Sequence, residues 1–326
     1  MTLIKNFQNR IDNEIKTLFA TAENPRGLYE PVNYSMLLGG KRIRPTLCLV
    51  GCAMFNAEAV ESAVLPAVGL EVFHNFTLLH DDLMDNSVMR RNQPTVHQKW
   101  GANTAILSGD AMLVQAYQLC TKAPANVLHS VLSIFSKTAL EVCEGQQYDM
   151  NFEMRDNVSE VEYVEMIRLK TAVLLGGSLK IGAVIGGGDD ESISRLYGFG
   201  CNAGLSFQLQ DDWLDVFGNS DDFGKPIGGD IVCNKKTFLL ISALNDLPDK
   251  GRKELKKWLA AKEFDREDKI AAVKNLYDEA NISKKTREKM NFYYQNALER
   301  LDGIKDCGEI VSKLKEFAHG LMERAR

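Results

Sequence analysis

Apolar residues recur at helical spacing along most of this sequence. The repeat is clearest over residues 59–85, 104–120, 193–217 and 236–247, where apolar side chains return every three or four positions. Alternating apolar and polar positions flanked by hairpin turns, the usual mark of strands, are nearly absent. We therefore expect an all-α protein with ten or more helices.

The pattern changes toward the C-terminus. Residues 193–217 are apolar on nearly every side, which is typical of helices buried among other helices. From about residue 249 the chain becomes charge-rich and amphipathic, as in "KGRKELKKWLAAKEF", which suits helices on the outside of a bundle. No flexible linker marks the change, so residues 1–326 are expected to form one single helical domain.

Composition narrows the expected partners and compartment. The 326-residue chain is 45 % hydrophobic and 25 % charged, with a net charge of −5 and no basic tract, so no nucleic-acid partner is expected. No apolar run reaches the roughly 18–20 residues that span a bilayer, so no transmembrane segment is expected, and the first residues lack a signal-peptide pattern. The seven cysteines are scattered and form no CxxC pair, which predicts reduced thiols and a cytoplasmic location.

Two acidic clusters interrupt apolar stretches, in "TLLHDDLMD" (77–85) and "QLQDDWLD" (208–215). Residues four apart share a helix face, so the first and last aspartate of each cluster lie one turn apart. A lone cluster of this kind could be a solvated helix face, but here the flanks are apolar and the pattern occurs twice. Oxygen-only ligands favour Mg²⁺, which uses one or two carboxylates together with waters and phosphate oxygens. The candidate metal ligands are Asp81, Asp82, Asp85, Asp211, Asp212 and Asp215.

A diphosphate held by such ions also needs cations from the protein. They are found in "GGKRIRP" (39–45), "MRRNQPT" (89–95), "RLKTAVLL" (168–175) and "DDFGKPIGGDIVCNKKT" (221–237). Glycine permits close backbone approach, and arginine offers paired donors that match phosphate oxygens. Taken singly, each segment could instead be a basic turn on the surface or a charged helix end. The candidate cations are Lys41, Arg44, Arg90, Arg91, Lys170, Lys225 and Lys235.

Taken in order, these segments resemble the motifs of the trans-isoprenyl diphosphate synthases, over about residues 39–237. The resemblance implies a single helical bundle around a central cavity, usually a homodimer, that holds three Mg²⁺ ions. It implies an enzyme that joins isopentenyl diphosphate to an allylic diphosphate such as dimethylallyl, geranyl or farnesyl diphosphate. The departing diphosphate would then serve as the base.

The resemblance also implies roles for individual residues. Asp81 and Asp85 would hold two Mg²⁺ ions and Asp211 the third, with the other aspartates in support. The allylic diphosphate would be bound by Arg90, Lys170, Lys225 and Lys235. Isopentenyl diphosphate would be bound by Lys41, Arg44, His74 and Arg91. The catalytic group comprises Lys170, Thr171 and Gln208, of which the last two can aim oxygens at the developing cation.

His74 has two interpretations. It lies seven residues before Asp81, close to the same helix face. The usual explanation for such a residue is a core histidine bonded to a carbonyl group, whereas the resemblance assigns it to a substrate contact. His80, beside Asp81, points elsewhere and is expected to be structural.

Product length is expected to depend on the side chains one to two turns before Asp81. Thr77 is small, so the first turn is open, while Phe76 and Phe73 are the next bulky residues. In the resembling enzymes an aromatic at the Thr77 position favours a C15 product, and its absence with Phe76 retained is similar to C20 synthases. We therefore expect geranylgeranyl diphosphate (C20), with farnesyl diphosphate (C15) as the alternative. Both phenylalanines could instead simply pack the core.

Two rival classes remain. A terpene cyclase would ionise the same kind of substrate but would need no second diphosphate site. A non-catalytic subunit of a synthase heteromer would lack some aspartates or diphosphate-binding cations, and none is missing here.

Overall fold

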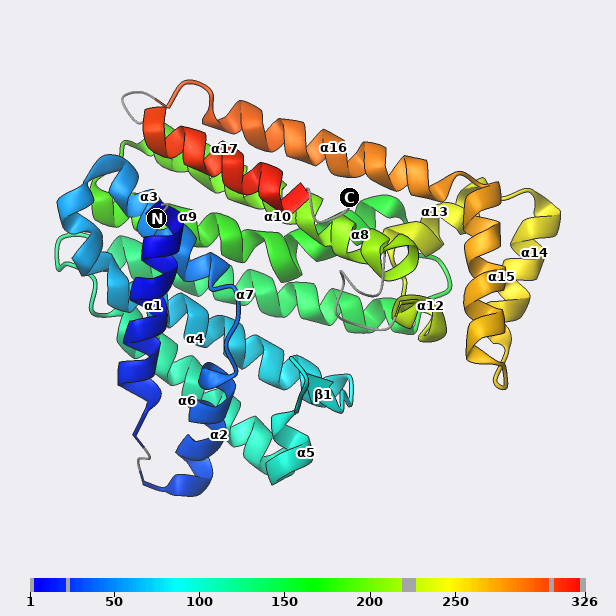
Figure 1. Cartoon of the computed structure of the whole chain (residues 1–326), viewed down its shortest axis with the longest axis horizontal. Coiled ribbons are helices and arrows are strands. Elements are labelled where there is room, and N and C mark those ends of the chain that lie inside the picture. The colour runs from blue at the N-terminus through cyan, green and yellow to red at the C-terminus, as the bar shows by residue number, and fades with distance from the viewer. Residues whose placement is uncertain (1–2, 22–23, 219–226, 305–307, 323–326) are drawn as a thin grey trace. The chain divides into compact units, whose positions relative to one another are not determined.

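The structure is a computed structural model that describes residues 3–21, 24–218, 227–304 and 308–322 (Figure 1). More than ten helices account for most of these residues, which confirms the predicted all-α fold. Among the described residues the strands are confined to one hairpin, in which β1 (Met89–Arg90) pairs antiparallel with β2 (Gln93–Pro94).

The chain divides into two compact units. Unit 1 comprises residues 1–139, 177–197 and 306–310, and unit 2 comprises residues 140–176, 198–305 and 311–326. The helices that contribute residues to both units are α7 (Leu128–Glu153), α9 (Val173–Gly186), α10 (Asp190–Phe217) and α17 (Gly308–Met322). The single domain over residues 1–326 stays a prediction.

Unit 1 is arranged around the long helix α4. Its other elements include α1 (Leu3–Phe19), α2 (Arg26–Leu37), α3 (Ile43–Phe55), η1 (Ala57–Ala59), α5 (Val96–Trp100) and α6 (Ala102–Cys120), with α4 spanning Val60–Met84. Helix α4 packs against α6 and α3 and buries apolar residues on several sides, among them Val64, Leu70 and Phe73. Gly69 allows the close approach to α6, because a Cβ atom there would lie 2.9 Å from the Ala116 carbonyl oxygen.

Unit 2 contains the amphipathic C-terminal helices. Its elements include α8 (Glu160–Ile167), η2 (Arg168–Ala172), α12 (Gly229–Val232), α13 (Phe238–Asp246), α14 (Asp249–Ala260), α15 (Arg266–Glu279) and α16 (Ile282–Leu301). Helix α14 buries only Gly251 and Leu255, whereas α13 buries every residue from Phe238 to Ala243, all of them apolar except Ser242. The predicted contrast between central and outer helices is therefore present within this unit.

Two helical stretches pass a length and apolarity test for crossing a membrane, namely Ala57–Met84 and Glu160–Gly186. Their apolar windows are 72 % and 78 % buried inside the protein. Buried core helices of soluble proteins pass the same test, so these two stretches are weak evidence for a membrane span.

Candidate active site

The first acidic cluster lies at the C-terminal end of α4. Asp81 and Asp82 are in the last turn, and Asp85 is the C-cap, with its N–H donated to the Asp81 carbonyl at 2.9 Å. A helix C-terminus carries partial negative charge, so three carboxylates there need cations nearby. Asp82 is buried, whereas Asp85 is exposed and Asp81 is 21 % exposed. Asp81 and Asp85 are therefore the two members that solvent-borne ions can reach.

Asp82 is held by an arginine instead. The Arg90 Nε donates to Asp82 Oδ2 at 2.6 Å, and a second nitrogen of Arg90 lies 3.9 Å from Asp81. The other oxygen of Asp82 is buried without a hydrogen-bond partner among the described residues. Burial raises the pKa of Asp82, partly offset by Arg90. This arrangement fits the expected supporting role for Asp82, since its carboxylate orients Arg90.

Arg90 and Arg91 do not end the helix, because the chain has already turned into the hairpin. Arg90 lies in β1, and Arg91 and Asn92 form the tight turn with φ of 51° and 60°. Positive φ suits asparagine far better than arginine, so the hairpin geometry imposes it on Arg91. The reading of this pair as a basic helix end is therefore wrong. The hairpin points Arg90 back at Asp82 instead.

A second group of cations surrounds His74 on α4. Burial, followed by the charges of Arg44, Arg91, Arg90 and Arg42, lowers the pKa of His74 well below its ordinary value, so the ring is neutral at pH 7. Burial likewise lowers the pKa of Arg44 to about 10, and the buried Nε of Arg44 lacks a hydrogen-bond partner among the described residues. Concentrated positive charge with an unsatisfied donor is the electrostatic signature of an anion site.

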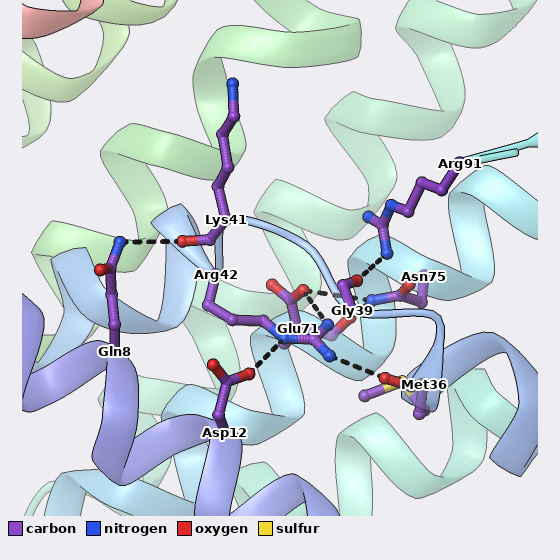
Figure 2. Close-up of polar contacts among 9 residues, drawn as sticks. All are labelled: Gln8, Asp12, Met36, Gly39, Lys41, Arg42, Glu71, Asn75 and Arg91. Carbon is purple, nitrogen blue, oxygen red and sulfur yellow. Dashed lines mark hydrogen bonds and ion pairs between the residues drawn. The ribbon is translucent and has the colours of Figure 1, made fainter. Parts of the chain in front are cut away.

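The glycine-rich loop contributes to the same region. Lys41 is exposed, and Arg91 donates a hydrogen bond to the Gly39 carbonyl oxygen (Figure 2). The guanidinium of Arg91 lies about 3.0 Å from where a Cβ atom of Gly40 would be. Glycine is therefore needed at that position so that the arginine can lie against the backbone. The structure thus gathers His74, Arg44 and Arg91 on one side of unit 1.

The second acidic cluster lies on α10 in unit 2 and is also asymmetric. Asp212 is buried, accepts a hydrogen bond from the Tyr163 hydroxyl, and accepts another from Gln208 Nε2 at 3.2 Å. Asp215 accepts a hydrogen bond from the Asp230 N–H at 2.9 Å. Asp211 is half-buried. As in the first cluster, the middle aspartate is held by protein groups.

These carboxylates lie under mutual repulsion. Burial first, and then the charge of Asp230, raises the pKa of Asp212 to about 7 and that of Asp215 to about 6. Burial and Asp212 raise the pKa of Tyr163 well above its ordinary value, so its hydroxyl remains a donor. A cation bound here would relieve the repulsion.

Asparagine at position 212 is expected to stabilise the metal-free protein at high pH. Because folding raises the pKa of Asp212 from 3.8 to about 7, its ionised form destabilises the fold above pH 7, and protonation relieves this as pH falls. With chelator present, Asp212→Asn should raise the melting temperature at pH 8 by about 2–5 °C, and the gain should shrink toward pH 5. Differential scanning calorimetry checks this, with the exposed Asp249→Asn as the control. A gain in melting temperature that grows as the pH falls would contradict the raised pKa of Asp212.

Lys170 and Thr171 lie in η2, a π-helical turn, rather than at the start of an ordinary helix. Lys170 Nζ pairs with Asp149 Oδ2 at 2.6 Å, and Thr171 Oγ1 donates to Gln208 Oε1 at 3.2 Å. A Cβ atom on Gly145 would lie 2.2 Å from the Lys170 backbone nitrogen, so glycine there lets α7 meet this turn. Single π-turns inside helices are frequent at functional sites.

A hydrogen-bonded chain therefore connects three of the predicted residues in unit 2. It runs from Thr171 through Gln208 to Asp212 and ends at Tyr163. Lys235 lies 4.0 Å from Asp230. Lys225 lies outside the described residues. Sequence reasoning missed Tyr163, Asp149 and Asp230, although Asp230 stands within "GKPIGGDI", a segment that already contained the candidate Lys225.

The chain-length candidates form an aromatic group on α4. Phe73 is fully buried, Phe76 is 8 % exposed, and their ring centroids lie 5.6 Å apart. Thr77 is half-buried, and its hydroxyl donates to the His74 carbonyl at 2.8 Å, which satisfies its polar group. His80 contacts the Phe76 ring and the Ile106 carbonyl, so it serves packing, as expected. Control of product length by these residues stays a prediction.

The two acidic clusters offer a metal ion only part of its ligands. Within the described ranges, no three histidine, cysteine or acidic side chains come together as a ready-made metal cage. Each acidic cluster nonetheless offers oxygen donors of the type Mg²⁺ prefers, and one oxygen of the buried Asp82 lacks a partner. The residues present fit a Mg²⁺ ion that takes one or two carboxylates and completes its shell with water and substrate oxygens.

Comparison with known proteins places the chain among prenyl synthases. The sequence profile of the polyprenyl synthetase family matches residues 25–277. The geranylgeranyl diphosphate synthase of Methanosarcina mazei is 37 % identical over 324 residues, covering 95 % of this chain and 94 % of that protein. A crystal structure of a geranylgeranyl pyrophosphate synthase superimposes with a TM-score of 0.94 at 42 % identity, covering 100 % of both chains. A geranylgeranyl pyrophosphate synthase from Corynebacterium glutamicum, complexed with isoprenyl diphosphate and magnesium, gives a TM-score of 0.86 at 27 % identity, covering 99 % and 98 %.

Proposed function

The chain belongs to the polyprenyl synthetase family and is a trans-prenyltransferase, and we propose that it condenses isopentenyl diphosphate with an allylic diphosphate to give C20 geranylgeranyl diphosphate. The observation that carries the proposal is the cation group around His74. Burial lowers the pKa of both Arg44 and Arg91 there, and the charge of Glu71 offsets this only in part, which suits an anion that needs no metal. A condensing enzyme needs such a second diphosphate site, whereas a terpene cyclase does not.

Mg²⁺ is the proposed cofactor. Asp81 and Asp85 would hold two ions and Asp211 a third, with Asp82, Asp212 and Asp215 in support. Bound Mg²⁺ would act as a Lewis acid on the leaving diphosphate of the allylic substrate. Support comes from the oxygen-only donors and from the related C. glutamicum enzyme complexed with magnesium.

The chain's own residues bind and orient the substrates. Arg90, Lys170 and Lys235 would contact the allylic diphosphate, each already oriented beside a carboxylate: Asp82, Asp149 and Asp230 respectively. Pre-placed cations stabilise a leaving group without reorganising when charge develops. Thr171 donates its hydrogen to Gln208, which leaves its oxygen lone pairs available toward a carbocation. Lys41, Arg44, His74 and Arg91 would hold isopentenyl diphosphate.

The assembly and compartment are further parts of the proposal. Ile106, Leu107 and Val114 on α6 are 47 %, 60 % and 58 % exposed, and an apolar surface of this kind suits a homodimer interface. Free thiols, several of them buried, suit a cytoplasmic protein. Sedimentation analysis would test the dimer.

Removing the Phe76 side chain is expected to lengthen the product. Phe76→Ala opens space beside Thr77, so products longer than C20 should appear in the reverse-phase chromatogram of extracted prenyl alcohols. Phe73→Ala should act in the same direction but also destabilise the fold by about 3–5 kcal/mol, since Phe73 is fully buried. Phe135→Ala is the matched control, because Phe135 is equally buried and contacts Phe73 from another helix. If neither Phe76→Ala nor Phe73→Ala changes the distribution of product lengths, these phenylalanines do not limit the length of the growing chain.

The proposed activity is tested by supplying labelled isopentenyl diphosphate with each allylic starter. Incorporation of the label supports a synthase. Release of a hydrocarbon without incorporation indicates a cyclase, and no turnover at all indicates a non-catalytic subunit. C15 as the sole product would favour the farnesyl alternative.

A further inference from the structure

The loop that presents Lys41 and leads into Arg44 in the first turn of α3 has an unusual backbone. It joins α2 to α3, and Gly39, Gly40 and Arg42 within it have φ values of 82°, 141° and 49°. Glycine adopts such angles freely, whereas arginine adopts them only where the surroundings impose them. Arg42 is also the N-cap residue of α3, so its conformation sets the direction in which that helix begins.

The side chain of Arg42 is buried beneath this loop and bonded to three different helices (Figure 2). Its Nε donates to Asp12 Oδ1 on α1 at 3.0 Å, and its Nη1 donates to Glu71 Oε1 on α4 at 2.8 Å. Its Nη2 donates to the Met36 carbonyl in α2 at 2.7 Å. Only a planar group with divergent N–H donors can reach three acceptors in this way, so lysine could not replace it.

This guanidinium is not available to bind an anion. Arg42 and Glu71 are 3 % and 2 % exposed, and the single positive charge of Arg42 faces two carboxylates, those of Glu71 and Asp12. Asn75 donates to the same Glu71 oxygen at 3.3 Å, which completes the network. Figure 2 shows the Lys41 side chain directed away from it. The buried pair therefore adds no net positive charge to the anion site.

The backbone of this loop is also held by side chains from α1 and from the hairpin. Gln8 Nε2 on α1 donates to the Lys41 carbonyl at 3.1 Å, and Arg91 donates to the Gly39 carbonyl. The Arg42 carbonyl accepts from the Thr46 N–H at 3.2 Å as the first turn of α3 forms. Each of these carbonyl groups is already bonded within the protein, so the contacts hold the loop backbone.

We propose that Arg42 is a positioning residue for the isopentenyl diphosphate subsite, and that Glu71 and Asp12 anchor it. The inference rests on the proposed function. The left-handed turn at Arg42 separates Lys41 from Arg44, and the buried contacts keep that turn formed when no diphosphate is bound. Because Asp12 and Gln8 belong to α1, the N-terminal helix becomes part of the subsite without touching the ligand.

The test compares two variants by calorimetric titration with isopentenyl diphosphate and by steady-state kinetics of the full-length enzyme. Asp12→Asn weakens one charged hydrogen bond, so the Kd and KM for isopentenyl diphosphate should rise about tenfold. Arg42→Lys keeps the charge but loses the three-way contact, so the rise should be about a hundredfold. The KM for farnesyl diphosphate should change less than about twofold in both, since that substrate is not bound by this loop.

Glu61→Gln is the matched control, because it removes an ion pair from Arg10 of α1 to α4 without touching the loop. It should leave both KM values unchanged. Equal rises for both substrates, or no rise in the Asp12→Asn variant, overturn the proposal. Asp12 is 40 % exposed, so its variant should fold even if Arg42→Lys does not. Wild-type protein that binds isopentenyl diphosphate without condensing it contradicts the proposed function, while the comparison of Kd values still tests the loop.

Discussion

The Asp81→Asn enzyme is expected to lose activity by a factor on the order of 100–1000 in kcat. Asp81 is a partly exposed aspartate in the last turn of α4, while its neighbour Asp82 is occupied by Arg90. Asparagine keeps the shape but removes the charge that would hold a divalent cation. Steady-state turnover at saturating substrate measures the effect, and a tenfold excess of Mg²⁺ should restore only part of the loss.

Asp110→Asn is a suitable control, since Asp110 is an exposed aspartate of α6 in the same unit. It should leave kcat unchanged. The parallel substitution Asp211→Asn tests the second cluster and should cause a comparable loss. Full activity in the Asp81→Asn enzyme would contradict the assignment of the first cluster to metal binding.

The Arg44→Met enzyme is expected to bind isopentenyl diphosphate about a hundredfold more weakly and yet to be more stable. Arg44 is a partly buried cation whose pKa is lowered to about 10 and whose buried Nε lacks a partner among the described residues. A buried charge without full compensation costs stability, so methionine should raise the melting temperature by about 1–3 °C. Weaker binding of isopentenyl diphosphate together with a higher melting temperature would show that Arg44 serves the ligand, whereas a structural arginine would lower the melting temperature when replaced.

Kinetics with isopentenyl diphosphate varied, together with calorimetric melting, measure both effects on one preparation. Arg195→Met provides the comparison, because Arg195 is a more exposed arginine of the same unit that pairs with Glu191. It should change neither quantity. A destabilised Arg44→Met protein with normal KM would show that the arginine supports the fold and not the substrate.

Much of the site could be predicted because its chemistry is local in sequence. The paired aspartates, the arginines after them and the glycine-rich loop are short segments whose residue types limit what they can bind. Helical periodicity placed both acidic clusters on helices, and the structure confirms that. Helix formation over such long apolar segments depends on neighbours three and four residues apart, which the sequence displays directly.

The parts that sequence reasoning missed depend on contacts between distant residues. Which aspartate of each cluster is buried is set by Arg90 for Asp82 and by Tyr163 for Asp212. Tyr163 lies 49 positions from its partner. The spacing of the motif puts the middle aspartate on a different helix face from the other two, but no local pattern identifies the distant residue that holds it. The same holds for Lys170, whose π-helical turn lies against Gly145 of a helix 25 positions earlier.

Arg42 illustrates the same limit within a recognised motif. In "GGKRIRP" the three basic residues have similar chemistry, and only the resemblance to a known family singled out Lys41 and Arg44 as diphosphate ligands. In the structure, Arg42 faces inward to Glu71 and Asp12, which lie 29 and 30 positions away. Composition could indicate an anion site here, but only the fold shows that Arg42 is occupied by these two carboxylates.

The most direct test of the central claim is a product assay with purified protein, Mg²⁺, labelled isopentenyl diphosphate and farnesyl diphosphate as the allylic partner. We expect the label to appear in a C20 prenyl diphosphate, identified by chromatography after dephosphorylation, and to disappear when chelator replaces Mg²⁺. Consumption of farnesyl diphosphate with no label in any prenyl product would contradict the account.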